Sequence, residues 1–116
     1  MTSLRFAAAL FDLDGTLIDS AQDLIASVQY ALKHAAPDRE PPEGDDILAL
    51  VGKPLEIILR ELRYPTDGAT EVRFVDTYRA HYAEHFDDHT ALYMGVEEML
   101  AYLRASGVEM ALVTTK

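Results

Sequence analysis

The sequence contains no cysteine and only half as many basic residues as acidic ones. The lack of cysteine excludes disulfide bonds, thiolate metal sites and a cysteine nucleophile, and it is typical of a reducing compartment. With 10 lysines and arginines against 20 acidic residues, the formal charge of −10 argues against nucleic acid or an anionic membrane as a partner. We therefore expect a cytoplasmic protein with neither of these partners.

A long hydrophobic run is also missing at the N-terminus. The apolar stretch at residues 4–11 is too short for a membrane span, and two aspartates follow it, so it is not a signal peptide either. The composition, 49% hydrophobic and 26% charged, is that of a soluble globular protein. A length of 116 residues suits one small domain or a part of a larger unit.

The same apolar stretch leads directly into the sequence Asp12-Leu13-Asp14-Gly15. This pattern predicts a strand that is buried on both faces of a parallel sheet. Residues two apart on an extended chain point to the same side, so Asp12 and Asp14 are expected to face one crevice beyond the strand. Gly15 allows the backbone to turn at once and leaves room for a ligand near the main chain.

Two carboxylates at such close range suit metal-assisted chemistry. Their mutual repulsion is relieved by a hard cation such as Mg²⁺. With that charge screened, one carboxylate can attack a phosphoryl group while the other transfers a proton to or from the leaving or entering oxygen. The alternative is an acidic turn at a strand end, because Asp and Gly are common turn formers, and a bare Asp-x-Asp pattern favours this alternative.

Apolar residues at helical spacing predict four helices between the first strand and residue 86. Their narrow apolar faces would be buried best in a small bundle. The expected helices are 20–36, 45–50, 54–62 and 69–86, the last with Val72, Val75, Tyr78, Tyr82 and Phe86 on its core side. A fifth helix at 96–106 leads through Gly107 into a second buried strand at 108–114, and this order predicts a parallel pair of strands.

Three histidines, His81, His85 and His89, follow one another at four-residue spacing. On one face of a continuous helix they would form a zinc site. The alternative is a set of solvent-facing imidazoles near a helix C-terminus, where partial positive charge is favourable. Asp87 and Asp88 indicate that the helix frays before His89, which favours the second interpretation.

The longer string Asp12-Leu13-Asp14-Gly15-Thr16-Leu17-Ile18-Asp19-Ser20, placed after an apolar strand, resembles the first motif of the haloacid dehalogenase superfamily. It is most similar to the phosphoglycolate phosphatase-like branch. The second motif of that family, an apolar strand that ends in Ser or Thr, is matched by the strand that ends at Thr114. The sequence departs from the family at Met94, where Pro is usual, and at Thr115, where many relatives have Asn.

The resemblance implies roles for individual residues. Asp12 would become an aspartyl-phosphate, Asp14 would serve as the general acid/base, and both would contribute to an Mg²⁺ site. The phosphate-binding residues would be Leu13, Thr114 and Thr115. An Asp at position 14 implies phosphomonoester chemistry, because an alkoxide leaving group needs a proton.

The resemblance also implies an α/β fold, a partial Rossmann-like core of parallel strands with an inserted α-helical cap of about four helices. Residues 1–17 and 87–116 would form the core, and residues 18–86 would form the cap, which closes over the active site. The turn at Gly52 and Lys53 falls where such caps carry a substrate-contacting loop, so Lys53 would reach a charged group of the substrate. The alternative is an exposed lysine that precedes a helix.

Two further motifs of the family are missing from this sequence: a Lys or Arg that neutralises the phosphate, and additional acidic Mg²⁺ ligands. The terminal Lys116 is no substitute for the former. The sequence therefore resembles the N-terminal half of an Mg²⁺-dependent phosphatase for a small phosphorylated metabolite such as phosphoglycolate, and the 116-residue chain is expected to be an incomplete, inactive portion of it. The alternatives are a catalytically silent chain, a homo-oligomer that shares strands between copies, and a sugar-phosphate mutase of the same family.

Overall fold

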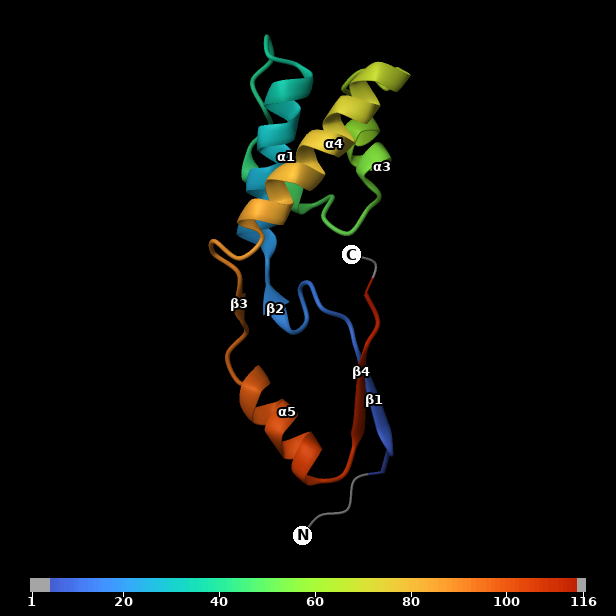
Figure 1. The fold of residues 1–116 in the computed structure, drawn as a ribbon, viewed down its shortest axis with the longest axis vertical. Coiled ribbons are helices and arrows are strands. Elements are labelled where there is room, and N and C mark those ends of the chain that lie inside the picture. Colours follow the sequence, from blue (N-terminus) through green and yellow to red (C-terminus); the bar gives the residue numbers. More distant parts are fainter. Residues whose placement is uncertain (1–4, 115–116) are drawn as a thin grey trace. The chain divides into compact units, whose positions relative to one another are not determined.

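The computed structural model describes residues 5–114, which form five helices and four short strands (Figure 1). The chain forms two compact units. One consists of the described residues up to Ser20 together with those from Thr90 onward, and the other is Ala21–His89. The predicted α/β class with parallel strands is confirmed.

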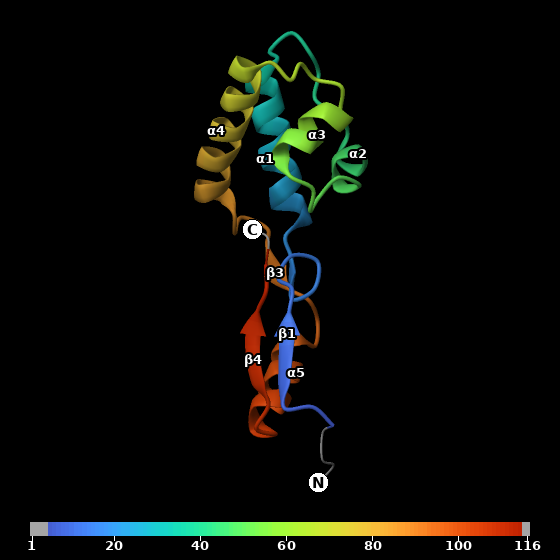
Figure 2. The ribbon, with the colours of Figure 1, turned by 90° about the vertical axis from the view of Figure 1, so that its right-hand side faces the viewer.

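The first unit is built on a parallel pair of strands, β1 (Ala8–Phe11) and β4 (Glu109–Leu112). The two strands lie side by side in both ribbon views, and Phe11 is opposite Leu112 in the register (Figures 1 and 2). Helix α5 (Val96–Ala105) precedes β4, and Gly107, with φ of +76°, makes the turn between them. The strand–helix–strand order of the prediction is confirmed.

The expectation that both strands are buried on two faces is wrong for this chain. Leu10 in β1 is 71% exposed, and Leu112 in β4 is 56% exposed. Within the described residues, α5 is the one helix of this unit, and an open apolar cleft of about 870 Å³ lies between it and the strands. The apolar sequence indicates that these strands are suited to a buried position. Whether they are buried depends on the layers that pack against them.

A second strand pair was not expected from the sequence. Strand β2 (Ile18–Asp19) pairs in antiparallel register with β3 (Ala91–Leu92). These strands directly precede and follow the helical unit along the chain. Two residues are too few to show an alternating pattern, so this pairing leaves no signal in the sequence.

The second unit contains the four predicted helices: α1 (Ala21–Ala35), α2 (Gly44–Leu48), α3 (Leu55–Glu61) and α4 (Gly68–His85). Figure 2 shows α1 between α4 and the two short helices. Pro54, expected as the first residue of its helix, stands one position before α3 in extended conformation. No helix in the described part of the chain is both long enough and apolar enough to cross a membrane.

The hydrophobic core of the described residues lies in this helical unit. Each of its large apolar side chains contributes about 1.5–3 kcal/mol by burial. The expected core face of α4 was partly wrong, because Val72 is 60% exposed and Phe86 is 48% exposed, while Phe74 is fully buried. Apolar residues occur on more than one face of α4, so the spacing alone did not select the inward face. The core cluster comprises Val28, Ala31, Leu32, Ile47, Ile58, Leu59, Tyr64 and Phe74.

Candidate active site

Strand β1 brings Asp12 to the carboxyl end of the parallel pair. The N–H of Val113 donates a 2.8 Å hydrogen bond to the carbonyl oxygen of Phe11, which continues the ladder beyond the strands. Asp12 follows Phe11 and Thr114 follows Val113, so both residues stand at the same edge of the sheet. In α/β proteins this edge is where ligands bind.

A tight turn fixes the chain directly after Asp12. The carbonyl oxygen of Leu13 accepts hydrogen bonds from the N–H groups of residues 16–18, at 3.0 to 3.3 Å. The N–H of Gly15 donates to the carbonyl oxygen of Ile18 at 2.9 Å. Gly15 has φ of +78°, a conformation that favours glycine. The turn expected from the Asp-Gly sequence is therefore present, and it holds Asp14 at its beginning.

Asp14 is positioned by a residue that the sequence analysis did not link to it. The hydroxyl of Ser20 donates a 2.6 Å hydrogen bond to Oδ1 of Asp14, and Ser20 is only 2% exposed. Ser20 directly precedes α1, a position at which serine commonly caps a helix, but its hydroxyl proton is directed to the carboxylate of Asp14. Both residues lie within the motif at residues 12–20, and this is the sequence feature from which their contact could have been inferred.

Asp12 is exposed, and its carboxylate bonds to its own neighbour. Its Oδ1 accepts a 2.8 Å hydrogen bond from the N–H of Leu13. This contact orients the carboxylate, and it also occupies the N–H group of a residue expected to bind phosphate. A phosphoryl oxygen that approached Asp12 would have to compete for that N–H.

The structure describes one of the two threonines that follow β4. Thr114 is exposed just beyond β4, at the edge that also carries Asp12. Thr115 lies outside the described residues, as does Lys116. The roles predicted for Leu13, Thr114 and Thr115 in binding phosphate stay predictions.

The donor set at the sheet edge fits a hard cation. Mg²⁺ prefers carboxylate oxygens, retains several waters, and is often held by one or two carboxylates together with substrate phosphate. Asp12 would supply such a carboxylate oxygen, and Asp14, two residues later, would supply its backbone carbonyl oxygen. No cluster of three or more His, Cys, Asp or Glu side chains suited to a metal ion occurs among residues 5–114.

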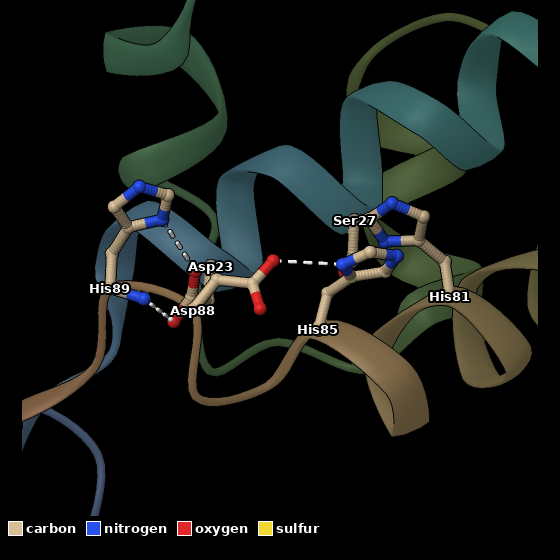
Figure 3. Close-up of polar contacts among 6 residues, drawn as sticks. All are labelled: Asp23, Ser27, His81, His85, Asp88 and His89. Carbon is tan, nitrogen blue, oxygen red and sulfur yellow. Dashed lines mark hydrogen bonds and ion pairs between the residues drawn. The ribbon is translucent and has the colours of Figure 1, made fainter.

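The three histidines considered as a zinc site do not all lie on one helix face. Figure 3 shows that each has a different partner. His89 lies beyond the end of α4, where its N–H donates to Oδ2 of Asp23 at 2.8 Å and its Nδ1 lies 3.1 Å from Oδ1. His81 and His85 remain on the helix, with their Nδ1 atoms bonded to other residues. The fraying after α4, expected from the two aspartates, explains this separation.

Gly52 and Lys53 occupy a turn in the helical unit. Gly52 has φ of +97°, and the chain then enters α3 through Pro54. Lys53 is exposed, and its Nζ lies 3.6 Å from Oε1 of Glu61. An exposed pair of this kind contributes little to stability, so Lys53 is not fixed in place by it. A role for Gly52 and Lys53 in a substrate site stays a prediction.

Comparison with known proteins identifies the family. A family model of haloacid dehalogenase-like hydrolases matches residues 9–116. The chain belongs to this family. Tyrosine-protein kinase PtkA of Mycobacterium tuberculosis is 38% identical over 108 residues, which cover 92% of this chain and 35% of that protein. A phosphoglycolate phosphatase of Chromobacterium violaceum is 35% identical over 122 residues, which cover 100% of this chain and 54% of that enzyme.

Solved structures agree with this assignment. The crystal structure of a predicted phosphoglycolate phosphatase from Haemophilus somnus superposes with a TM-score of 0.83 at 26% sequence identity, over 97% of this chain and 53% of that one. The superfamily and branch expected from the first motif are therefore confirmed. This haloacid dehalogenase-like chain spans between about a third and about half of the length of these relatives.

Proposed function

We propose that this chain carries the nucleophile and the general acid/base of a phosphomonoester hydrolase. The observation that carries the proposal is the pair Asp12 and Asp14, which a hydrogen-bonded turn holds at the carboxyl edge of a parallel sheet in a haloacid dehalogenase-like chain. The similarity to a phosphoglycolate phosphatase supports the same chemistry.

The proposed reaction has two displacements at phosphorus. In the first, a carboxylate oxygen of Asp12 forms a bond to phosphorus while the bond to the ester oxygen breaks, and Asp14 gives its proton to the leaving alkoxide. In the second, Asp14 takes a proton from a water molecule, whose oxygen attacks phosphorus and releases Asp12. The products are an alcohol and inorganic phosphate, and both carboxyl groups return to their starting states.

The phosphoryl oxygens need donors at the same edge. The hydroxyl of Thr114 and the N–H of Leu13 are suited to this role, together with Thr115. The N–H of Leu13 now donates to Asp12, and it would exchange that bond for one to the substrate. Asp12, through its carboxylate, and Asp14, through its backbone carbonyl, would hold Mg²⁺, which when bound would supply the positive charge that screens the carboxylate of Asp12 and the phosphate from one another.

The helical unit is proposed to act as the cap predicted from the sequence, with residues 18–86 as its expected extent. Lys53 would then contact a charged group of the substrate. The exposed ion pair between Lys53 and Glu61 contributes little to stability, so Lys53 can leave Glu61 and contact the substrate. The substrate class is a small phosphorylated metabolite, with phosphoglycolate as the first candidate, and the cytoplasm is the expected location.

The 116-residue chain by itself is proposed to be inactive. The cation that neutralises phosphate in this family, and the further acidic metal ligands, are not found in this sequence and would have to be supplied from outside it. A sugar-phosphate mutase uses the same two aspartates, but it returns the phosphoryl group to its product. Release of phosphate separates these two functions.

The test is a panel of phosphate esters that includes phosphoglycolate and a hexose phosphate. It is run on the 116-residue chain and on a form extended to the length of the relatives. We expect Mg²⁺-dependent phosphate release by the extended form, loss of that release in Asp12→Asn, and unchanged release in the control Asp46→Asn, which alters an exposed acid of α2. Full activity of Asp12→Asn contradicts the mechanism. Chelator-sensitive release by the 116-residue chain contradicts its proposed inactivity, and isomerisation without release indicates a mutase.

A further inference from the structure

Four aromatic rings form a column between α1 and α4. The centroid of the Tyr30 ring lies 4.2 Å from that of His34 and 4.2 Å from that of His81. The centroids of His81 and His85 are 4.3 Å apart, with an interplanar angle of 27°. Two of the rings belong to α1 and two to α4, so the column joins the two helices. Three of the four rings are imidazoles, which titrate near neutral pH.

Hydrogen bonds hold the two histidines of α4 in this column. Nδ1 of His81 lies 2.8 Å from the hydroxyl oxygen of Ser27, a fully buried residue of α1 (Figure 3). Nδ1 of His85 lies 2.8 Å from Oδ2 of Asp88, which follows the end of α4. The hydroxyl of Ser27 can donate to a neutral ring or accept from a protonated one, whereas an ionised carboxylate such as that of Asp88 can only accept a hydrogen bond.

The surroundings of His81 disfavour its charged form. Burial lowers the pKa of His81, the nearby imidazoles of His85 and His34 lower it further, and the carboxylates of Asp88 and Glu84 act in the opposite direction. On the α1 side, the ring faces Tyr30 and the uncharged hydroxyl of Ser27. A surface groove of about 450 Å³, which Asp76 and Glu84 also line, reaches the rings of Tyr30, His81 and His85, so water can exchange protons with the column.

We propose that this column is an acid-sensitive joint of the helical unit, in which protonation of His81 loosens α4 from α1. Neutral His81 stacks between Tyr30 and His85 and bonds to Ser27. Once His81 is protonated, its ring centroid carries a positive charge 4.3 Å from that of His85, whose electrostatic repulsion lowers the pKa of His81, and the site is shielded from solvent on the α1 side. The repulsion and the lost hydration both weaken the contact between the helices.

The sign of the pH effect follows from linkage. Because the pKa of His81 is lower in the folded chain than in the unfolded chain, the unfolded chain binds the extra proton more readily. Stability is therefore unaffected well above the ordinary pKa of histidine, about 6.5. It falls as the pH decreases through that value and continues to fall until the pH is below the folded-state pKa. This inference does not depend on the proposed phosphatase activity.

The experiment uses the 116-residue chain and follows the helical circular dichroism signal in urea from about pH 7.5 to about pH 5.5. We expect the urea midpoint of the wild-type chain to fall over this range and that of His81→Gln, which keeps a polar side chain but cannot titrate, to fall less. The matched variant His89→Gln removes a histidine outside the column. It is expected to retain the full wild-type loss, because His89 contacts Asp23 and none of the rings of the column.

A second measurement decides the matter even where His81→Gln fails to fold. NMR titration of the wild-type chain is expected to show His81 protonating below the pH at which histidine titrates in the unfolded chain, and His85→Gln is expected to move that titration upward. An equal loss of stability in wild type and His81→Gln overturns the proposal. A His81 titration at or above the unfolded-chain value overturns it as well.

Discussion

The hydroxyl of Ser20 donates a 2.6 Å hydrogen bond to Oδ1 of Asp14, so the acidic turn is tied to the residue that directly precedes α1 along the chain. Ser20 is the last residue before α1, and it is almost fully buried. The carboxylate proposed as the general acid/base is therefore oriented by the residue at which the chain enters the first helix. A change at Ser20 is expected to alter the placement of Asp14 without touching the nucleophile.

Replacing Ser20 by alanine is expected to lower the kcat of the extended phosphatase by about ten- to a hundredfold, because Asp14 loses the hydrogen bond that aims it. KM should change less, since Ser20 is not expected to touch substrate. Steady-state kinetics measure both parameters.

The conservative variant Ser20→Thr keeps a hydroxyl at this position and is expected to retain most of the activity. A loss in Ser20→Thr equal to that in Ser20→Ala would indicate that packing at this buried position matters, and not the hydrogen bond. An unchanged kcat in Ser20→Ala, or a rise in KM with kcat unchanged, would contradict the positioning role.

Burial predicts opposite outcomes for two leucines. Leu32 of α1 is fully buried in the helical core, whereas Leu10 of β1 is 71% exposed. Leu32→Ala is expected to lower the free energy of unfolding by about 2–5 kcal/mol, because it removes buried methyl groups and leaves a cavity. Leu10→Ala is expected to change it by no more than about 0.5 kcal/mol in the 116-residue chain. Urea denaturation of both variants measures the difference, and comparable losses would show that β1 is covered in solution.

Two glycines give a matched test of the acidic turn. Gly15 has φ of +78° with open space around the position of a side chain, so Gly15→Ala is expected to cost about 1–2 kcal/mol from backbone conformation alone. Gly68 begins α4, also with open space around it but at an ordinary φ, so Gly68→Ala is expected to be neutral or to stabilise by up to about 1 kcal/mol. Thermal unfolding measures both variants. Similar effects at the two positions would contradict the turn described here.

The sequence was informative where one local pattern decides the outcome. The apolar run before Asp12 identified the end of β1, and helical spacing located α1 and α4 to within about one or two residues at each end. The sequence did not identify which side chain of α4 is buried, because burial depends on contacts with distant segments. Phe74 is buried, whereas Val72, which was expected on the core side, is exposed. The hydrogen bond between Ser20 and Asp14 was also not predicted, because a serine directly before a helix is usually interpreted as its N-cap.

The N-cap of α4 predicts how the helical unit responds to strong acid. The carboxylate of Asp67 accepts hydrogen bonds from the N–H and the hydroxyl of Thr70, both at 2.9 Å, and these bonds lower the pKa of Asp67 below its ordinary value of 3.8. The stabilisation that this cap gives to the helical unit is therefore fully present above pH 3.8 and is lost as the pH falls through the lowered pKa of Asp67. Asp67→Asn also caps a helix but does not titrate in this range.

The wild-type chain is accordingly expected to lose more of its urea resistance than Asp67→Asn between about pH 4.5 and about pH 2.5, a range below the titration of histidine. The helical circular dichroism signal measures both midpoints, and Asp46→Asn serves as a control for the removal of one exposed acid. Parallel losses in wild type and Asp67→Asn would show that the cap bond does not depend on the charge of Asp67. Asp46→Asn is expected to lose as much urea resistance as the wild-type chain, because Asp46 contributes a general charge and not a hydrogen-bonded cap.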